Sequence, residues 1–177
     1  MVSGFIRQFT GLLIHPRSTL ASLKETPLRF AFIYFCIVWT VFAALLLLVG
    51  PRLEPPPLAM DQFTLVWFVV LVFIGWLFLG LVVQVFLRIV TGPRNITKTY
   101  RAVLYSATPL AVIGWIPFIT GLSFIWGLVI LKRGLEEYHE ISGVAAFLIP
   151  ILAFVIAMMV IGIAYFSFLF AVTLAFP

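Results

Sequence analysis

Residues 63–87 read FTLVWFVVLVFIGWLFLGLVVQVFL, and this stretch contains no charged residue. A helix needs about 20 apolar residues to cross a hydrocarbon layer that is roughly 30 Å thick. The stretch is long enough, so we expect it to form one transmembrane span. Residues 30–50 form a similar interval, which ends at Gly50 and Pro51, a pair typical of a helix end.

A third apolar interval, residues 102–131, is interrupted by Pro109 and Pro117. We therefore expect two short helices, at 102–116 and 118–131, which either cross the membrane twice or form a re-entrant hairpin. Both alternatives return the chain to the side from which it came. The later spans therefore keep the same orientation under either alternative.

The two prolines at 109 and 150 have different expected consequences. Pro109 lacks an N–H donor, so the carbonyl near position 105 loses its hydrogen-bond partner. The hydroxyl of Ser106 or Thr108 is placed to bind this carbonyl. The second lies in a long charge-free interval, where we expect a span over 147–175. We expect Pro150 to kink this interval and to separate an initial interfacial segment from the span.

The amino-acid composition of the whole chain is also typical of a membrane protein. Hydrophobic residues make up 64% of the 177 residues and charged residues only 10%, whereas soluble domains carry about 25% charged residues. The predicted fold class is all-α: a polytopic membrane protein with a five-helix transmembrane bundle. Residues 1–29 form a cytoplasmic segment, and residues 30–177 form the membrane domain.

The segment before the first span has its own helical pattern. Apolar residues recur at helical spacing from Phe5 to Leu13, with Arg7 on another face. Pro16 interrupts the pattern, and Pro27 closes a second short helix. We expect amphipathic helices that either lie in the headgroup layer or pack under the bundle.

Basic residues are distributed unevenly between the two sides of the predicted bundle. Five spans place ten of the eleven basic residues on one side and only Arg52 on the other. The positive-inside rule then puts the amino terminus in the cytoplasm and the carboxyl terminus outside. We expect anionic lipid headgroups or a partner to bind a cytoplasmic surface formed by Arg7, Arg17, Lys24, Arg29, Arg94, Lys98 and Arg101.

No set of residues predicts catalysis, a cofactor or nucleic-acid binding. The spans contain no ionisable residue, and the basic residues do not cluster as a nucleic-acid footprint requires. The single cysteine, Cys36, excludes an internal disulfide or a thiolate zinc site. No serine–histidine pair, pair of aspartates or glycine-rich phosphate loop is present.

The most polar stretch, residues 131–140, has a metal-site interpretation and a simpler one. Glu136, His139 and Glu140 share a helix face and could together bind a metal. However, three candidate ligands, of which only one is a histidine, are few for a metal site. Spacing of four residues predicts the ion pairs Lys132–Glu136 and Arg133–Glu137 instead, and we predict no metal. The same spacing makes Gln84 and Arg88 a possible hydrogen-bonded pair.

Several short motifs occur in a characteristic order. They are LIHPR (13–17), LKETP (23–27), YSATP (105–109), WIP (115–117), WGL (126–128) and GLEEYH (134–139). In this order they resemble the Yip (Ypt-interacting protein) domain family, over roughly residues 9–160. The residues that carry the resemblance most directly are Tyr105, Pro109, Pro117, Trp126, Gly134 and Glu137.

The resemblance implies a five-span membrane protein with a cytoplasmic amino terminus. Eukaryotic members of the family act in vesicle traffic and associate with Rab-type small GTPases and with one another. This chain has only a short cytoplasmic lead-in, and Leu104 stands where their motif has glycine. We therefore expect a prokaryotic-type member in the cell membrane, without a small GTPase partner.

Two functions are compatible with these features. The first is a non-enzymatic membrane-organising or scaffold protein that associates with itself or with other membrane proteins. The alternative is a small-solute permease or channel component, built around the broken hairpin at 109–121 and its hydroxyl groups. The charge-free spans argue against ion transport.

Overall fold

The described part of the chain folds into helices and contains no strand. The computed structural model describes residues 2–53, 62–116, 119–141 and 143–175. The all-α prediction is confirmed for these residues. In chain order the elements are α1 (Val2–Ile14), α2 (Pro16–Ser22), α3 (Leu28–Leu48), α4 (Gly50–Leu53), α5 (Gln62–Thr91), α6 (Ile96–Ser106), the π-helix η1 (Leu110–Gly114), α7 (Thr120–His139) and α8 (Val144–Ala175).

Within the described residues, three helical stretches are long and apolar enough to cross a membrane. They overlap the first, second and last of the predicted spans, which supports an integral membrane protein. The stretches are Leu28–Arg52, Phe63–Thr91 and Val144–Phe168.

The predicted spans at 102–116 and 118–131 have a different character. Helix α6 has only 11 residues and ends at Ser106. Helix α7 has 20 residues, but its second half carries two basic and two acidic side chains between Lys132 and Glu137. Neither helix combines the length and apolarity of the other three, so the count of five spans remains a prediction.

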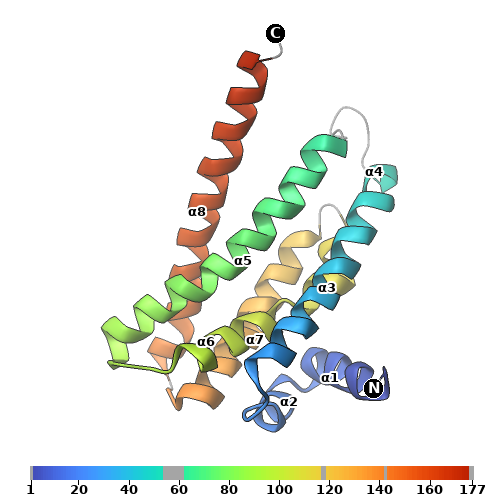
Figure 1. The fold of residues 1–177 in the computed structure, drawn as a ribbon. Coiled ribbons are helices and arrows are strands. Elements are labelled where there is room, and N and C mark those ends of the chain that lie inside the picture. The colour runs from blue at the N-terminus through green and yellow to red at the C-terminus, as the bar shows by residue number, and fades with distance from the viewer. Residues whose placement is uncertain (1, 54–61, 117–118, 142, 176–177) are drawn as a thin grey trace.

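The hairpin formed by α6, η1 and α7 lies inside the frame of the three long helices. Helix α6 contacts α3 on one side and α5 on another, while α8 packs against α5 and α7. Figure 1 shows α4 and the first turns of α5 at one end of the bundle, with α2 and the end of α7 at the opposite end. The last turns of α8 lie at the same end as α4 (Figure 1).

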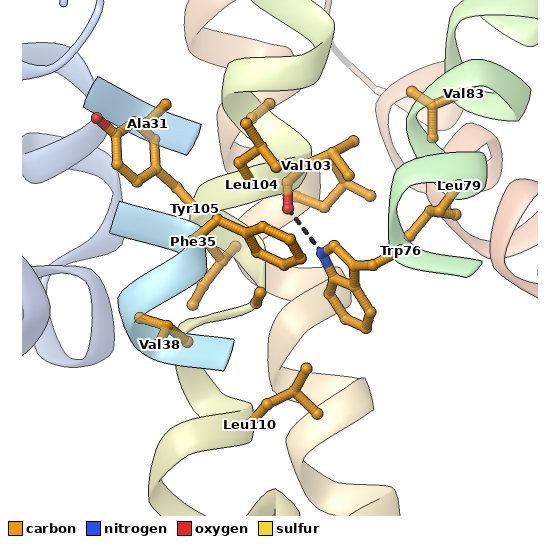
Figure 2. Close-up of a cluster of buried hydrophobic side chains, with 14 of the residues drawn as sticks. Ala31, Phe35, Val38, Trp76, Leu79, Val83, Val103, Leu104, Tyr105 and Leu110 are labelled. Atoms are coloured by element: carbon orange, nitrogen blue, oxygen red, sulfur yellow. Dashed lines mark hydrogen bonds between the residues drawn. The ribbon is translucent and has the colours of Figure 1, made fainter. Parts of the chain in front are cut away.

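This central position buries the second half of α6, with residues 101–106 all inaccessible or nearly so. The indole Nε1 of Trp76 on α5 donates a hydrogen bond to the Val103 carbonyl, at 2.9 Å. Figure 2 shows this bond beside Phe35 of α3, whose side chain is fully buried. Helices α3, α5 and α6 therefore share one apolar core.

At Pro109, where the helical hydrogen bonding is interrupted, hydroxyl groups bind the freed carbonyl, as predicted. Thr108 Oγ1 donates a hydrogen bond to the Tyr105 carbonyl at 2.6 Å. That proton is then committed, so the Tyr34 hydroxyl at 2.9 Å donates to Thr108 Oγ1. Ser106, the other candidate, bonds the Val103 carbonyl instead. The prediction that Thr108 or Ser106 satisfies the freed carbonyl is confirmed, with Thr108 as the donor.

The second half of the hairpin begins at Thr120. Its hydroxyl donates to the carbonyls of Gly114 and Ile116, at 3.0 and 2.8 Å. These bonds hold the end of η1 against the first turn of α7. The predicted turn at Pro117 lies outside the described residues.

Helix α8 differs from the expectation at Pro150. The helix begins at Val144 and continues through Pro150 without a separate initial segment. Proline lacks the N–H group that would donate to the carbonyl four residues earlier, so one backbone hydrogen bond of the helix is lost. In apolar surroundings the other backbone groups gain most from staying helical, so a single proline does not end the helix.

Helices α1 and α2 pack against the bundle through part of their apolar residues. Leu12 and Leu20 are fully buried, and the ring of Phe5 lies 5.2 Å from that of Tyr34, centroid to centroid. Ile14, by contrast, is 68% exposed. These helices therefore bury one set of apolar side chains and leave another accessible.

Small residues allow α6 and α7 to approach closely. A Cβ at Gly127 would lie 2.9 Å from the Ser106 carbonyl oxygen, and one at Gly134 would lie 2.7 Å from the Ala102 Cβ. Both distances are too short for real atoms, so glycine is required at this contact. A Cβ at Gly121, in the same helix, would meet nothing within 4 Å.

We predict that Gly134→Ala destabilises the protein and that Gly121→Ala does not. Overpacking costs about 1–3 kcal/mol, which exceeds the gain of roughly 0.5–1 kcal/mol that alanine brings to a helix interior. The measurement is equilibrium unfolding in detergent micelles, followed by tryptophan fluorescence. Equal stability of the two variants would contradict the close contact between α6 and α7.

Candidate functional site

Basic residues from three distant segments meet at one end of the bundle. Lys24 Nζ lies 3.4 Å from Glu140 Oε1, which joins the turn after α2 to the end of α7. Arg17 lines a surface hollow together with Arg133, and Arg94 lines another with Lys98 and Glu140. We call this the basic end, defined by Arg17, Lys24, Arg94, Lys98 and Arg133.

The other basic residues of the predicted surface are placed differently. Arg7 on α1 is exposed, and so is Arg29 in the first turn of α3, whose Cζ lies 5.0 Å from the centre of the Phe30 ring. Arg101 is only 8% exposed, contrary to its expected place on the surface, because α6 is enclosed by its neighbours. Arg52 lies in α4, at the opposite end of the bundle.

A chain of buried hydrogen bonds holds the basic end together. Thr99 Oγ1 donates to Gln84 Oε1, and Gln84 Nε2 donates to the Arg94 carbonyl at 2.8 Å. His139 Nε2 lies 3.0 Å from Thr99 Oγ1. The hydroxyl proton is already used, so the histidine nitrogen carries the proton and donates it. One continuous path therefore joins α5, α6 and α7.

Burial and charge together keep His139 neutral. Its side chain is 3% exposed. Burial is the larger cause, and the nearby positive charges of Arg94 and Lys98 add to it, so that the pKa of His139 falls to about 4. A neutral imidazole with its proton on Nε2 matches the role of donor to Thr99.

The acidic residues of 131–140 form ion pairs. Glu136 receives hydrogen bonds from Lys132 at 2.7 Å and from Arg133 at 2.9 Å. Burial raises the pKa of Glu136, but these two partners outweigh it and the net pKa is lowered. The predicted Lys132–Glu136 pair is confirmed, whereas Arg133 pairs with Glu136 in place of Glu137. Three or more candidate metal ligands do not come together anywhere in the described residues.

Beside this network lies a buried cation with unused donors. The Arg101 guanidinium lies against the ring of Tyr138, with Cζ 5.7 Å from the ring centre. Its Nε and Nη1 atoms have no hydrogen-bond partner among the described residues, and neither has the Tyr138 hydroxyl. Buried donors of this kind are costly unless an acceptor meets them.

The family-like residues of the sequence are distributed along the central hairpin. Tyr105 is buried with its ring 5.2 Å from that of Tyr34, and Pro109 precedes η1. Gly134 forms the close contact with α6, whereas Trp126 is 40% exposed. Glu137 lines the hollow that also holds Arg17 and Arg133.

Sequence reasoning missed the partners in the buried network. It paired Gln84 with Arg88, one turn away, whereas the structure pairs Gln84 with Thr99 and with the Arg94 carbonyl. Thr99 and His139 are 40 residues apart. Helical spacing predicts neighbours within one helix and carries no signal for contacts between helices.

We predict that acid destabilises the protein through His139. Because folding lowers the pKa of this residue from 6.5 to about 4, the unfolded chain binds more protons than the folded chain between these values. The contribution of His139 to stability is complete above pH 6.5 and is lost as the pH falls towards 4. It amounts to at most about 3 kcal/mol.

The measurement compares unfolding of the wild type and His139→Gln in micelles at several pH values. Glutamine keeps a neutral donor for Thr99 and does not titrate. The free energy of unfolding of this variant should therefore depend less steeply on pH between 6.5 and 4 than that of the wild type. Parallel slopes in the two proteins would show that His139 is not held neutral.

The family comparison covers nearly the whole chain. The family model of the Yip1 domain matches residues 10–173, from α1 to the last turns of α8. No curated protein and no solved structure matches the chain. The three long apolar helices agree with the membrane character expected of this family. The chain therefore belongs to the Yip1 domain family.

Proposed function

We propose that this protein is a non-enzymatic membrane-organising protein, whose basic end, together with the exposed Arg7 and Arg29, binds anionic lipid headgroups and whose bundle associates with copies of itself or with other membrane proteins. The observation that carries the proposal is the meeting of cations from three distant segments at the basic end. Such a cluster attracts an anionic membrane surface. We propose no nucleic-acid partner and no small GTPase partner.

The proposed topology has five spans, with the hairpin of α6, η1 and α7 providing two of them. The positive-inside rule supports a cytoplasmic basic end, a cytoplasmic amino terminus and a carboxyl terminus outside a prokaryotic cell membrane. The exposed Ile6 and Ile14 of α1, at 54% and 68%, support an interfacial position for this helix. In that position they would enter the headgroup layer.

A non-enzymatic role is supported by the way in which the polar residues are used. Glu136 and Glu140 are engaged in ion pairs, and His139 is a hydrogen-bond donor to Thr99. A general acid or base must be free to exchange its proton with a substrate. These residues serve the packing of the helices.

The alternative of a solute permease requires a polar path through the bundle. The hydroxyls near the break are Ser106, Thr108 and Ser123, and each bonds a backbone carbonyl three residues earlier. Hydroxyls used in this way do not favour a solute path. Membrane organisation is therefore the function that we propose.

The test replaces exposed cations of the predicted surface and leaves the buried network intact. Arg7, Arg17 and Arg29 are all exposed, so the triple variant Arg7→Glu, Arg17→Glu, Arg29→Glu should fold normally. Each surface charge is worth about 1 kcal/mol in attraction to anionic lipid. We expect the triple variant to lose most of its preference for phosphatidylglycerol over phosphatidylcholine.

The preference is measured with protein reconstituted in mixed vesicles, from quenching of tryptophan by brominated lipids of either kind. The control is Arg52→Glu, a reversal of an exposed charge at the opposite end, which should have a smaller effect than Arg17→Glu alone. The proposal fails if the triple variant selects anionic lipid as strongly as the wild type at low salt.

A further inference from the structure

A small polar hollow lies where the start of α6 meets the end of α7. Its volume is about 250 Å³, and its walls include Arg94, Asn95 and Lys98 from one side and Tyr138, His139 and Glu140 from the other. Sites for drug-sized ligands span about 300–1,000 Å³. The hollow therefore suits a small polar group.

The charges that face this hollow are predominantly positive. Arg94 and Lys98 line it directly, and both are half-buried. The carboxylate of Glu140 is engaged by Lys24, which offsets its charge. His139 adds no charge, because it is held neutral as the donor to Thr99. Two cations therefore remain without a compensating anion in the walls.

A further cation lies behind the wall, and this observation is independent of the lining charges. Arg101 lies against the ring of Tyr138, a wall residue, and is 92% buried by its relative exposure of 8%. Its Nε and Nη1 donors are unused, as is the Tyr138 hydroxyl. A buried guanidinium with free donors is stabilised most by an anion with several acceptor oxygens. The neighbouring acidic residue Glu137 lines the other hollow, together with Arg17.

The backbone at the start of α6 adds to the positive electrostatic potential of the hollow. Asn95 caps the helix by accepting a hydrogen bond from the Thr97 amide at 2.9 Å, so the first turn is well formed. The amino-terminal end of a helix carries a partial positive charge that favours phosphate. This contribution supplements the three arginine and lysine side chains.

We propose that this hollow is a phosphate-binding pocket, lined by Arg94, Lys98 and Tyr138, with the Arg101 guanidinium behind the Tyr138 ring. The ligand class is a terminal phosphate group, as in a phosphomonoester or inorganic phosphate, because a doubly charged group matches the two uncompensated cations of the walls and the buried guanidinium behind them. The inference deepens the proposed function, on which it rests, by naming a specific headgroup chemistry. The source is either a phosphatidic acid type of lipid or a free phosphate, and the experiment separates them.

The test uses the full chain in phosphatidylcholine nanodiscs and measures the dissociation constant of three probes. The probes are dihexanoyl phosphatidic acid, dihexanoyl phosphatidylglycerol and inorganic phosphate. We expect the phosphatidic acid to bind more tightly than the phosphatidylglycerol, which carries only one negative charge. We expect Lys98→Gln to weaken binding of phosphatidic acid by about tenfold, because one charge-assisted bond is lost.

The variants separate a pocket from a general charge effect. Arg88→Gln is the matched control, since Arg88 is exposed near the end of α5 and does not line the hollow. Arg101→Lys keeps the charge but removes the planar fork, and should also weaken binding. If Arg101→Lys fails to fold, Lys98→Gln still decides. Equal binding by wild type and Lys98→Gln overturns the proposal, as does equal weakening in Arg88→Gln.

The probes then identify the source. Binding of inorganic phosphate without phosphatidic acid supports the pocket with a soluble source, and binding of phosphatidic acid supports the lipid. Absence of binding by both overturns the pocket. The proposed function is judged separately: if the triple variant at Arg7, Arg17 and Arg29 loses its preference for anionic lipid while no probe binds, only the pocket is rejected.

The two histidines of the chain provide an independent readout by NMR. An anion in the hollow would favour the charged form of His139, so phosphate binding should raise its pKa from about 4. His15, on another part of the surface, serves as the internal reference. An unchanged titration of His139 at saturating phosphatidic acid would place the lipid elsewhere and overturn the proposal.

Discussion

Polar groups in the central hairpin need partners in surroundings that offer no water, and this requirement organises the rest of the structure. Helix α6 is enclosed by α3, α5 and α7, so the carbonyl that Pro109 frees must find a donor within the protein. Thr108 supplies it, and Tyr34 donates to Thr108 in turn. The break in the helix is thereby fixed to α3, and a turn that proline would otherwise destabilise becomes a defined point of contact between helices.

The same requirement explains the basic end. His139, Thr99 and Gln84 are buried, and each satisfies the next in a path that reaches the Arg94 carbonyl. The path fixes the end of α7 against the start of α6 and the last turns of α5. The positions of Arg94 and Lys98 follow from it, because the Arg94 carbonyl accepts the last bond of the path and Lys98 directly precedes Thr99 in α6. A polar network in the interior thus determines where positive charge is presented.

The elements that were predictable from sequence are those that depend on local pattern. The stretches at 30–50 and 63–87 are apolar over a length that only a membrane-spanning helix needs. Helix α3 covers the first as far as residue 48, and α5 contains the whole of the second. Both Ser106 and Thr108 were predicted as candidates to bind the freed carbonyl, and only the structure identifies Thr108 as the donor. The course of α8 through Pro150 was not predicted, because the propensity of one residue gives little information about the packing of a whole helix. The burial of Arg101 and its contact with Tyr138 depend on how α6 and α7 pair, which the spacing within either helix does not reveal.

The proposed topology places the basic end and Arg52 on opposite faces of a membrane. Single cysteines at positions 17 and 52, in a chain whose own Cys36 is replaced by alanine, can be labelled in sealed vesicles with a reagent that does not cross the bilayer. Both positions are exposed, so access is not limited by packing. We expect one cysteine to react from outside and the other only after the vesicles are opened. Labelling of both from the same face would contradict the account.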